Sequence, residues 1–107
     1  MREISPRELA DRLKTGAPTF LIDVREPWEH RTAALPGSHL VPLGELSVRA
    51  ATLAPPADAL VVTYCHHGMR SLAAAAALER AGLAAVVSLA GGIDAWSATI
   101  DPTLQRY

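Results

Sequence analysis

Cysteine is almost absent from this sequence, which holds a single one, Cys65, among 107 residues. One cysteine cannot form a disulfide within the chain, so a small scaffold held together by disulfides is excluded. Residues 1–5 are polar and carry no charged-then-apolar leader. We therefore expect the protein to work in a reducing cytoplasm, with its thiol free.

An excess of charge of one sign is also missing, because 10 Lys and Arg residues face 11 Asp and Glu residues, for a net charge of −1. Without a basic run, the chain offers no large electrostatic field for nucleic acid or for an anionic membrane. No apolar stretch approaches the roughly 20 residues that span a bilayer, because the alanine-rich run ends at Glu79 and Arg80. We predict neither nucleic acid nor a membrane as a partner.

Aromatic residues are scarce, at 5%, although half of all residues are hydrophobic. The core must therefore consist mainly of Ala, Leu and Val. A chain of this length and composition can enclose one core without disulfides or metal. Since no linker or internal repeat interrupts the chain, we predict a single domain over residues 1–107.

Short apolar runs alternate with helical patterns along the chain. The runs typical of strands cover residues 19–24, 38–41, 60–64 and 85–89. The helical patterns cover a segment from the capping box at residues 5–8 to Gly16, then residues 43–53, 71–81 and 93–96. Because parallel strands need crossover connections, this alternation predicts an α/β fold with a parallel sheet and helices on both faces.

Cys65 opens the hexapeptide Cys-His-His-Gly-Met-Arg, between the predicted strand 60–64 and the predicted helix 71–81. At such a turn, backbone N–H groups of the loop and of the helix start form an anion-binding nest that favours thiolate over thiol. Gly68 can adopt the positive φ that a tight loop needs. Arg70 can hold two oxyanion oxygens, and Ser71 is a natural cap for the helix. The loop therefore predicts a nucleophilic cysteine.

Two other roles for Cys65 are weaker. An inert core cysteine would not need two histidines, a glycine and an arginine directly after it. A zinc site built from Cys65, His66 and His67 with His30 or His39 lacks the paired spacing of known zinc ligands. We expect no metal and no cofactor, and we interpret His30 and His39 as surface or structural residues.

Four motifs in order give the chain a resemblance to the rhodanese-like sulfurtransferases over nearly its whole length. Residues 23–29 resemble the D-V-R-E-x-x-E segment of that family, and residues 35–43 its I-P-G-A-x-x-I-P-L segment. Residues 65–71 are similar to the C-x-x-G-x-R-S loop, and residues 89–96 to the L-x-G-G-x-x-x-W signature. One departure is the pair Ala33-Ala34, where the family often has Gly-His. The tail after Trp96 resembles the end of rhodanese domains fused to adenylating enzymes that activate sulfur-carrier proteins.

The resemblance implies a rhodanese-like fold with a five-stranded parallel sheet. It also implies a reaction in which the cysteine takes sulfane sulfur from a donor such as thiosulfate and passes it to a thiophilic acceptor such as cyanide. The expected partners are thus a small sulfur-containing anion as donor, and an acceptor thiol or a sulfur-acceptor protein. We expect Cys65 to carry the persulfide. The residues expected to bind the donor are His66, His67, Gly68, Met69 and Arg70. Those expected to support the site are Asp23, Arg25, Glu26 and Ser71, the first three through an ion-pair network.

Two rival functions stay open at this stage. Cysteine phosphatases and related arsenate reductases use a Cys-x5-Arg loop, whereas Cys-x4-Arg here is one residue tighter and suits a sulfur atom or a small sulfur oxyanion better. No second cysteine could resolve an intermediate. The other rival is a binding module that recognises a partner or senses oxidants through Cys65. The sequence also leaves open the oligomeric state, and whether Trp28 and Trp96 form the rim of the site or pack in the core.

Overall fold

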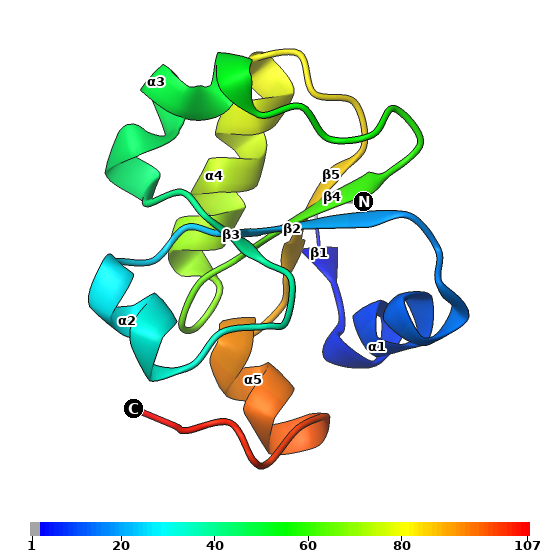
Figure 1. Ribbon diagram of the computed structural model, residues 1–107, viewed down its shortest axis with the longest axis vertical. Coiled ribbons are helices and arrows are strands. Elements are labelled where there is room, and N and C mark those ends of the chain that lie inside the picture. The colour runs from blue at the N-terminus through cyan, green and yellow to red at the C-terminus, as the bar shows by residue number, and fades with distance from the viewer. Residues whose placement is uncertain (1–2) are drawn as a thin grey trace.

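The sheet of this protein is entirely parallel and five-stranded, as seen in a computed structural model that describes residues 3–107. Its strands are β1 (Glu3–Ile4), β2 (Thr19–Asp23), β3 (His39–Leu40), β4 (Leu60–Tyr64) and β5 (Val86–Leu89). They lie in the order β1-β5-β4-β2-β3 (Figure 1). The central strand β4 pairs with β2 on one side, in register from Thr19 against Leu60, and with β5 on the other, in register from Val61 against Val86. The predicted α/β class with a five-stranded parallel sheet is confirmed.

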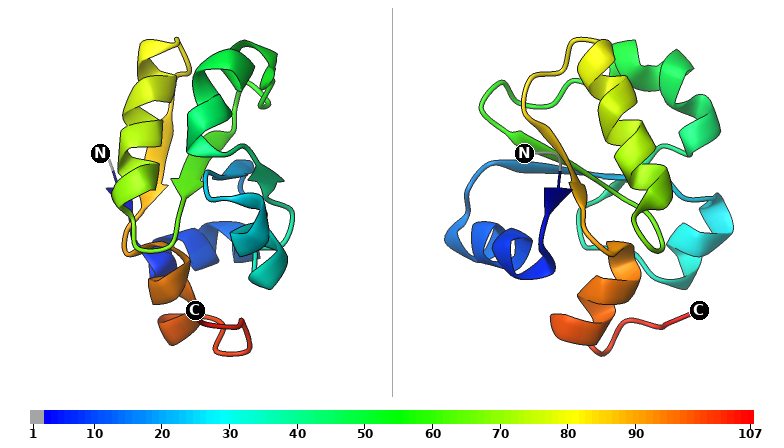
Figure 2. Two further views of the ribbon diagram at one scale, coloured as in Figure 1. Left: turned by 90° about the vertical axis from the view of Figure 1, so that its left-hand side faces the viewer. Right: turned by 180° about the vertical axis from the view of Figure 1, so that it is seen from behind.

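Helices cover both faces of the sheet. They are α1 (Pro6–Thr15), α2 (Pro27–Thr32), α3 (Leu46–Arg49), α4 (Met69–Arg80) and α5 (Gly92–Thr99). Leu9 of α1 and Trp96 of α5 belong to the buried cluster on one face, whereas Leu46 of α3 and Leu78 of α4 belong to the cluster on the other. Figure 2 shows the two layers from the side and from behind. Within residues 3–107, none of the helices is both long and apolar enough to cross a bilayer.

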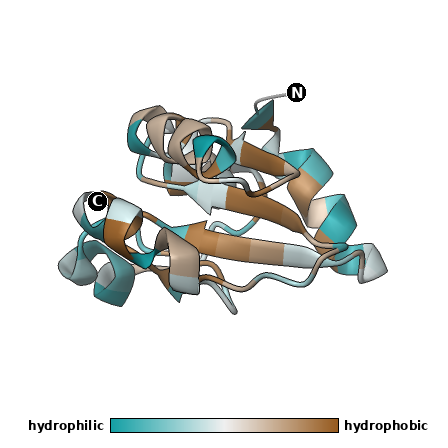
Figure 3. Ribbon diagram, turned by 90° about the horizontal axis from the view of Figure 1, so that it is seen from above, coloured by the Kyte–Doolittle hydropathy of each residue, from teal (hydrophilic) through white to brown (hydrophobic). Residues whose placement is uncertain are grey.

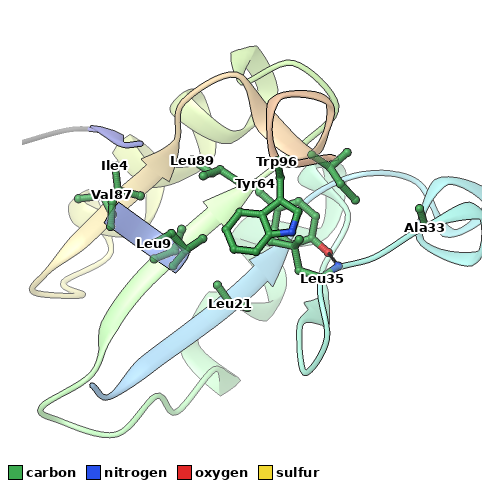
Figure 4. Packing of buried hydrophobic residues seen from close by; sticks show 11 residues of the cluster. Ile4, Leu9, Leu21, Ala33, Leu35, Tyr64, Val87, Leu89 and Trp96 are labelled. Atoms are coloured by element: carbon green, nitrogen blue, oxygen red, sulfur yellow. Dashed lines mark hydrogen bonds between the residues drawn. The ribbon is translucent and has the colours of Figure 1, made fainter. Parts of the chain in front are cut away.

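The strands are apolar on both sides because both faces are covered, and Figure 3 shows them as brown ribbons within the molecule. Leu21 and Val62 point into the first cluster, and their chain neighbours Ile22 and Val61 point into the second. In the first cluster, Trp96 and the ring of Tyr64 lie at the centre of Figure 4. These two large side chains fill a core that is otherwise aliphatic.

The predicted start and end of the first helix are confirmed. The Ser5 hydroxyl accepts the Glu8 N–H, and the Glu8 carboxylate accepts the Ser5 N–H, both at 3.1 Å. The helix ends at Gly16, whose φ of 76° is left-handed. This capping box satisfies two N–H groups that the helix leaves unpaired.

Several boundaries differ from the prediction. The segment predicted as one helix over 43–53 is a short α3 between two 3₁₀ turns, Leu43–Glu45 and Ala50–Thr52. The predicted cap at Ser71 is wrong, because α4 begins at Met69 and Gly68, with φ 106°, is its N-cap. Left-handed backbone at this point needs no side-chain cap, so the helix starts two residues earlier and Ser71 lies within its first turn. Helix α2 and strand β1 were not predicted, since both are short and neither carries an apolar period.

Candidate active site

Cys65 directly follows the central strand β4, at the edge of the sheet where all the strands end. Ligands of open parallel α/β sheets bind beyond this edge, and helix starts gather there. A hollow of about 560 Å³ is lined by residues 55–61 and 82–85 with Arg12. Because that hollow surrounds the beginning of β4, it lies at the other end of the strand from Cys65. The reactive group and the large hollow are therefore separate features.

The Cys65 sulfur lies in a cradle made by the loop that follows it. Its Sγ accepts the backbone N–H of Gly68 at 3.0 Å and that of Ser71 at 3.3 Å. The thiol also donates to the Ser71 hydroxyl at 3.4 Å. The whole residue is 1% exposed. N–H groups that converge on one atom stabilise negative charge on it, so the cradle suits a sulfur nucleophile.

Ser71 ties this cradle to the sheet. Its hydroxyl donates to the Gly68 carbonyl at 3.2 Å and lies 2.7 Å from the Ser88 hydroxyl of β5. It is fully buried, as are Thr63 and Ser88. The Thr63 hydroxyl donates to the Ser71 carbonyl at 2.7 Å. The side chain predicted to support the site thus does so by contacting the sulfur and the loop backbone, in place of capping α4.

The start of α5 holds the other side of the loop. The N–H of Ile93 donates to the Cys65 carbonyl at 2.8 Å, and the N–H of Asp94 donates to the His66 carbonyl at 3.1 Å. A Cβ on Gly92 would collide with both carbonyls, and the φ of Gly92 is 63°. A glycine at this position is what lets the helix approach so closely. The two loop carbonyls therefore point into the helix and leave the sulfur facing N–H groups.

The Arg70 guanidinium, predicted to bind the donor anion, is already paired with a carboxylate of the protein. Its Nη1 and Nη2 donate to the two carboxylate oxygens of Glu29, at 2.7 and 2.9 Å. Glu29 is buried, whereas the Arg70 side chain is 37% exposed. The hydrogen bonds from Arg70 outweigh burial and lower the pKa of Glu29 to about 2, and the same bonds raise the pKa of Arg70. The guanidinium is thus a fixed positive charge at the site, with both Nη atoms already engaged.

Asp23 and Arg25 form a fully buried ion pair behind the loop. Asp23 accepts from the Arg25 Nε at 2.8 Å and from its Nη2 at 2.7 Å, and it also contacts His30 and the Tyr64 hydroxyl. Burial disfavours the Arg25 charge, but the hydrogen bonds to Asp23 and Tyr107 outweigh it and raise the Arg25 pKa. Glu26 was predicted to belong to the same ion-pair network. It instead lies exposed at the N-terminus of α2.

The two loop histidines differ in their surroundings. The His66 ring lies 3.9 Å from the His67 ring and stacks at 3.9 Å on the Tyr107 ring. Burial lowers the pKa of His66, and the neighbouring His67 charge lowers it further. His67 is exposed, with its Nδ1 3.9 Å from Asp94. Met69 is 81% exposed on the outer side of the loop.

The remaining histidines lie elsewhere. His30 contacts Asp23, and His39 stacks on Phe20 at 4.5 Å. Throughout residues 3–107, no three side chains of His, Cys, Asp or Glu are grouped so as to hold a metal ion. Trp96 packs in the core, 6% exposed, whereas Trp28 is 53% exposed with its edge toward Tyr107.

Sequence reasoning missed two residues that the structure brings to the loop, Glu29 and Tyr107. Glu29 had a signal, because it is the last acidic residue of the segment 23–29. Tyr107 had none beyond its aromatic character, since it lies 37 residues beyond the end of the cysteine loop in the sequence and reaches it only through the fold. Its hydroxyl donates to Glu29 at 2.8 Å and accepts from Arg25 at 2.8 Å.

Comparison with known proteins gives a consistent result. The sequence model of the Rhodanese-like domain matches residues 5–99. A probable adenylyltransferase/sulfurtransferase of Mycobacterium tuberculosis, MoeZ, is 38% identical over 97% of this chain, which spans only 26% of that protein. A sulfurtransferase of Allochromatium vinosum is 34% identical, with 91% of this chain and 89% of that protein covered.

Among solved structures, a rhodanese-related protein of Thermoplasma volcanium superposes with a TM-score of 0.82 at 33% identity, covering 98% of this chain and all of that one. The fold, the order of the motifs and these relatives agree. The chain belongs to the rhodanese-like domain family.

Proposed function

We propose that this protein moves sulfane sulfur from a small anionic donor such as thiosulfate to a thiophilic acceptor, through a persulfide on Cys65. The observation that carries the proposal is the cradle in which two backbone N–H groups and the Ser71 hydroxyl face a buried sulfur at the end of β4. The two N–H donors stabilise negative charge on the sulfur, both on the attacking thiolate and on the persulfide that forms from it.

In the first step, the Cys65 thiolate attacks the outer sulfur of thiosulfate. A new S–S bond forms, the S–S bond of thiosulfate breaks, and its electron pair leaves with sulfite. In the second step, a thiolate or cyanide attacks the terminal sulfur of the persulfide, and Cys65 regains its thiolate. These 107 residues contain no second cysteine, so the acceptor lies outside them.

The surrounding residues have distinct roles in this proposal. Gly68 and Ser71 hold the sulfur, and Arg70 supplies a fixed positive charge that attracts the donor anion and stabilises the departing sulfite. Asp23 and Arg25 act at a distance, by bracing the end of β2. His66 and His67 offer ring nitrogens beside the donor. The relative MoeZ carries adenylyltransferase and sulfurtransferase in its name, which supports an acceptor protein activated by adenylylation.

The rival functions differ from sulfur transfer in what they require or produce. A phosphatase needs an arginine free to hold two phosphate oxygens, whereas both Nη atoms of Arg70 engage Glu29. A module that senses oxidants through Cys65 would gain oxygen on that residue, which cyanide does not remove as thiocyanate.

Intact-protein mass spectrometry after incubation with thiosulfate tests the proposal. We expect a gain of about 32 Da, one sulfur atom, which cyanide removes as thiocyanate. The Cys65→Ser variant, nearly isosteric, should show no gain. If wild-type protein gains no sulfur from thiosulfate or from organic thiosulfonates, the proposal is wrong.

A further inference from the structure

The segment after α5 folds back over the active-site end of the sheet and reaches α2, as Figures 1 and 2 show in red. It turns at the end of α5, where Ile100 and Asp101 both donate to the Trp96 carbonyl. Leu104 packs against the buried cluster, and Arg106 donates to Asp94 at 2.9 Å. The segment is therefore held at several points before it reaches the loop.

Tyr107, at the end of this path, contacts the start of the cysteine loop directly and the residue that holds its end. Its ring stacks on His66, the residue directly after Cys65, with centroids 3.9 Å apart and planes at 10°. Its hydroxyl donates to Glu29, the carboxylate that holds Arg70 at the other end of the loop. One side chain thus contacts the loop at His66 and is linked to Arg70, at the other end of the loop, through Glu29.

Hydrogen bonds to two buried residues fix the position of the Tyr107 hydroxyl. Its hydroxyl accepts from the Arg25 Nη1 and donates to the Glu29 Oε2, both at 2.8 Å, so its donor and one acceptor site are used. Both partners are buried. Burial raises the pKa of Tyr107 to about 12, so the hydroxyl keeps its proton at neutral pH. Trp28 supports the ring from the side, with an edge contact at 5.6 Å. A ring anchored in this way is a fixed wall.

We infer that Tyr107 is a specificity-determining residue: it forms the outer wall of the donor site, admits small anions to Cys65 and excludes donors with a bulky group. The inference rests on the proposed sulfur transfer. It follows from the position of the ring over His66, the residue next to Cys65, whose side chain is already almost completely covered. A donor that reaches this sulfur must fit between the loop and the wall. Neither the loop backbone nor the start of α5 can yield, because each is fixed by hydrogen bonds.

A graded series of donors tests this wall. Thiosulfate, methanethiosulfonate and benzenethiosulfonate all present one sulfane sulfur. With a thiosulfonate, Cys65 takes that sulfur, the S–S bond breaks, and its electron pair leaves with the sulfinate. Enlarging the group on the leaving side therefore changes the size of the donor while the bond that breaks stays the same.

We expect Tyr107→Ala to raise kcat/KM for benzenethiosulfonate relative to thiosulfate by about tenfold, with methanethiosulfonate between them. Tyr107→Phe keeps the ring and should retain most of the wild-type preference. Val48→Ala, at an exposed position of α3, is the control and should leave the ratio unchanged. An unchanged ratio in Tyr107→Ala, or an equal change in Tyr107→Phe, would overturn the inference.

A second measurement needs no sulfur transfer. The rates at which iodoacetamide and its N-phenyl derivative alkylate Cys65 can be followed by mass, in protein whose folding is checked by circular dichroism. We expect Tyr107→Ala to accelerate the phenyl reagent more than iodoacetamide, whereas equal acceleration of both would refute the wall. Absence of persulfide with every donor would instead refute the proposed function while this size dependence is still observed.

Discussion

Glu29 gives the sharpest test of how the site is held together. Its buried carboxylate accepts two hydrogen bonds from Arg70, one from Tyr107 and one from the Glu26 backbone N–H at 3.0 Å. Replacing it by glutamine keeps the shape of the side chain and removes its charge. The amide group then places two N–H donors where Arg70 and Tyr107 also donate, so part of the network has no acceptor.

The size of the effect follows from the pKa of Glu29, which hydrogen bonds from Arg70 lower from its ordinary 4.5 to about 2. A shift of this size corresponds to at most about 3 kcal/mol of folding free energy at neutral pH. Since Arg70 is 37% exposed, solvent screening reduces this figure to about 2 kcal/mol. For a domain of this length, such a loss lowers Tm by roughly 10 °C.

The pH dependence has a definite sign. Because the pKa of Glu29 is lower in the folded state, its contribution is fully present above 4.5 and is lost as the pH falls toward 2. By pH 3.5, roughly two fifths of the contribution is gone. The gap in stability between wild type and Glu29→Gln should therefore narrow in acid.

Urea unfolding followed by the fluorescence of the two tryptophans, one of them the buried Trp96, measures the free energy of unfolding of both proteins at pH 7 and pH 3.5. Taking the difference between the two proteins removes the contribution of other carboxylates. A gap below about 0.5 kcal/mol at pH 7, or a gap that is the same at both pH values, would refute the assigned charge network.

Three further substitutions test the loop and its support. Gly92→Ala should cost about 3 kcal/mol or more, because its Cβ collides with loop carbonyls at a positive φ, whereas Gly44→Ala, with open space around it, should be near neutral; similar thermal shifts for the two would count against the docking of α5. Asp23→Asn leaves the buried Arg25 without its carboxylate and should cost about 3 kcal/mol in urea unfolding, so a loss under about 1 kcal/mol would contradict a buried ion pair. Ser71→Ala removes the hydroxyl that donates to the Gly68 carbonyl, which loosens the loop that holds the sulfur, and should slow persulfide formation three- to tenfold, roughly the value of one hydrogen bond; an unchanged rate would remove the hydroxyl from the mechanism.

The fold could be predicted from the sequence because its signals are local. The strand 60–64 and the helix that ends at Gly16 are each marked by their own apolar pattern and by the residues that stop them. Helix α2 has no such pattern, since it is six residues long and its one large apolar side chain, Trp28, stays half exposed. It forms because Pro27 favours a helix start, and because Arg70 and Tyr107, both outside the helix, donate hydrogen bonds to Glu29.

In the candidate site, too, the local features could be predicted from the sequence and the contacts between distant residues could not. The loop at residues 65–70 is contiguous, so its nest, its positive-φ glycine and its place after a strand could all be inferred. The partner of Arg70 could not, because Glu29 lies 41 residues earlier in the chain. Sequence reasoning assigned the arginine fork to the substrate since nothing near it in the chain competes for it. Ser71 was misplaced for a related reason, because a serine after a loop is typical of a cap, yet the left-handed Gly68 starts α4 first.

Glu29 and Tyr107 show that the site depends on residues outside the cysteine loop. The loop alone sets the sulfur among N–H groups, but its charge and its opening depend on segments far away in the sequence. Arg70 is positioned through Glu29, and Glu29 lies 78 residues from Tyr107, which donates to the same carboxylate. A change at Glu29 therefore affects both the positive charge of Arg70 and the anchoring of the Tyr107 ring. Charge and access at this cysteine are coupled through one buried carboxylate, so substitutions that alter donor size preference are expected to alter the affinity for anions as well.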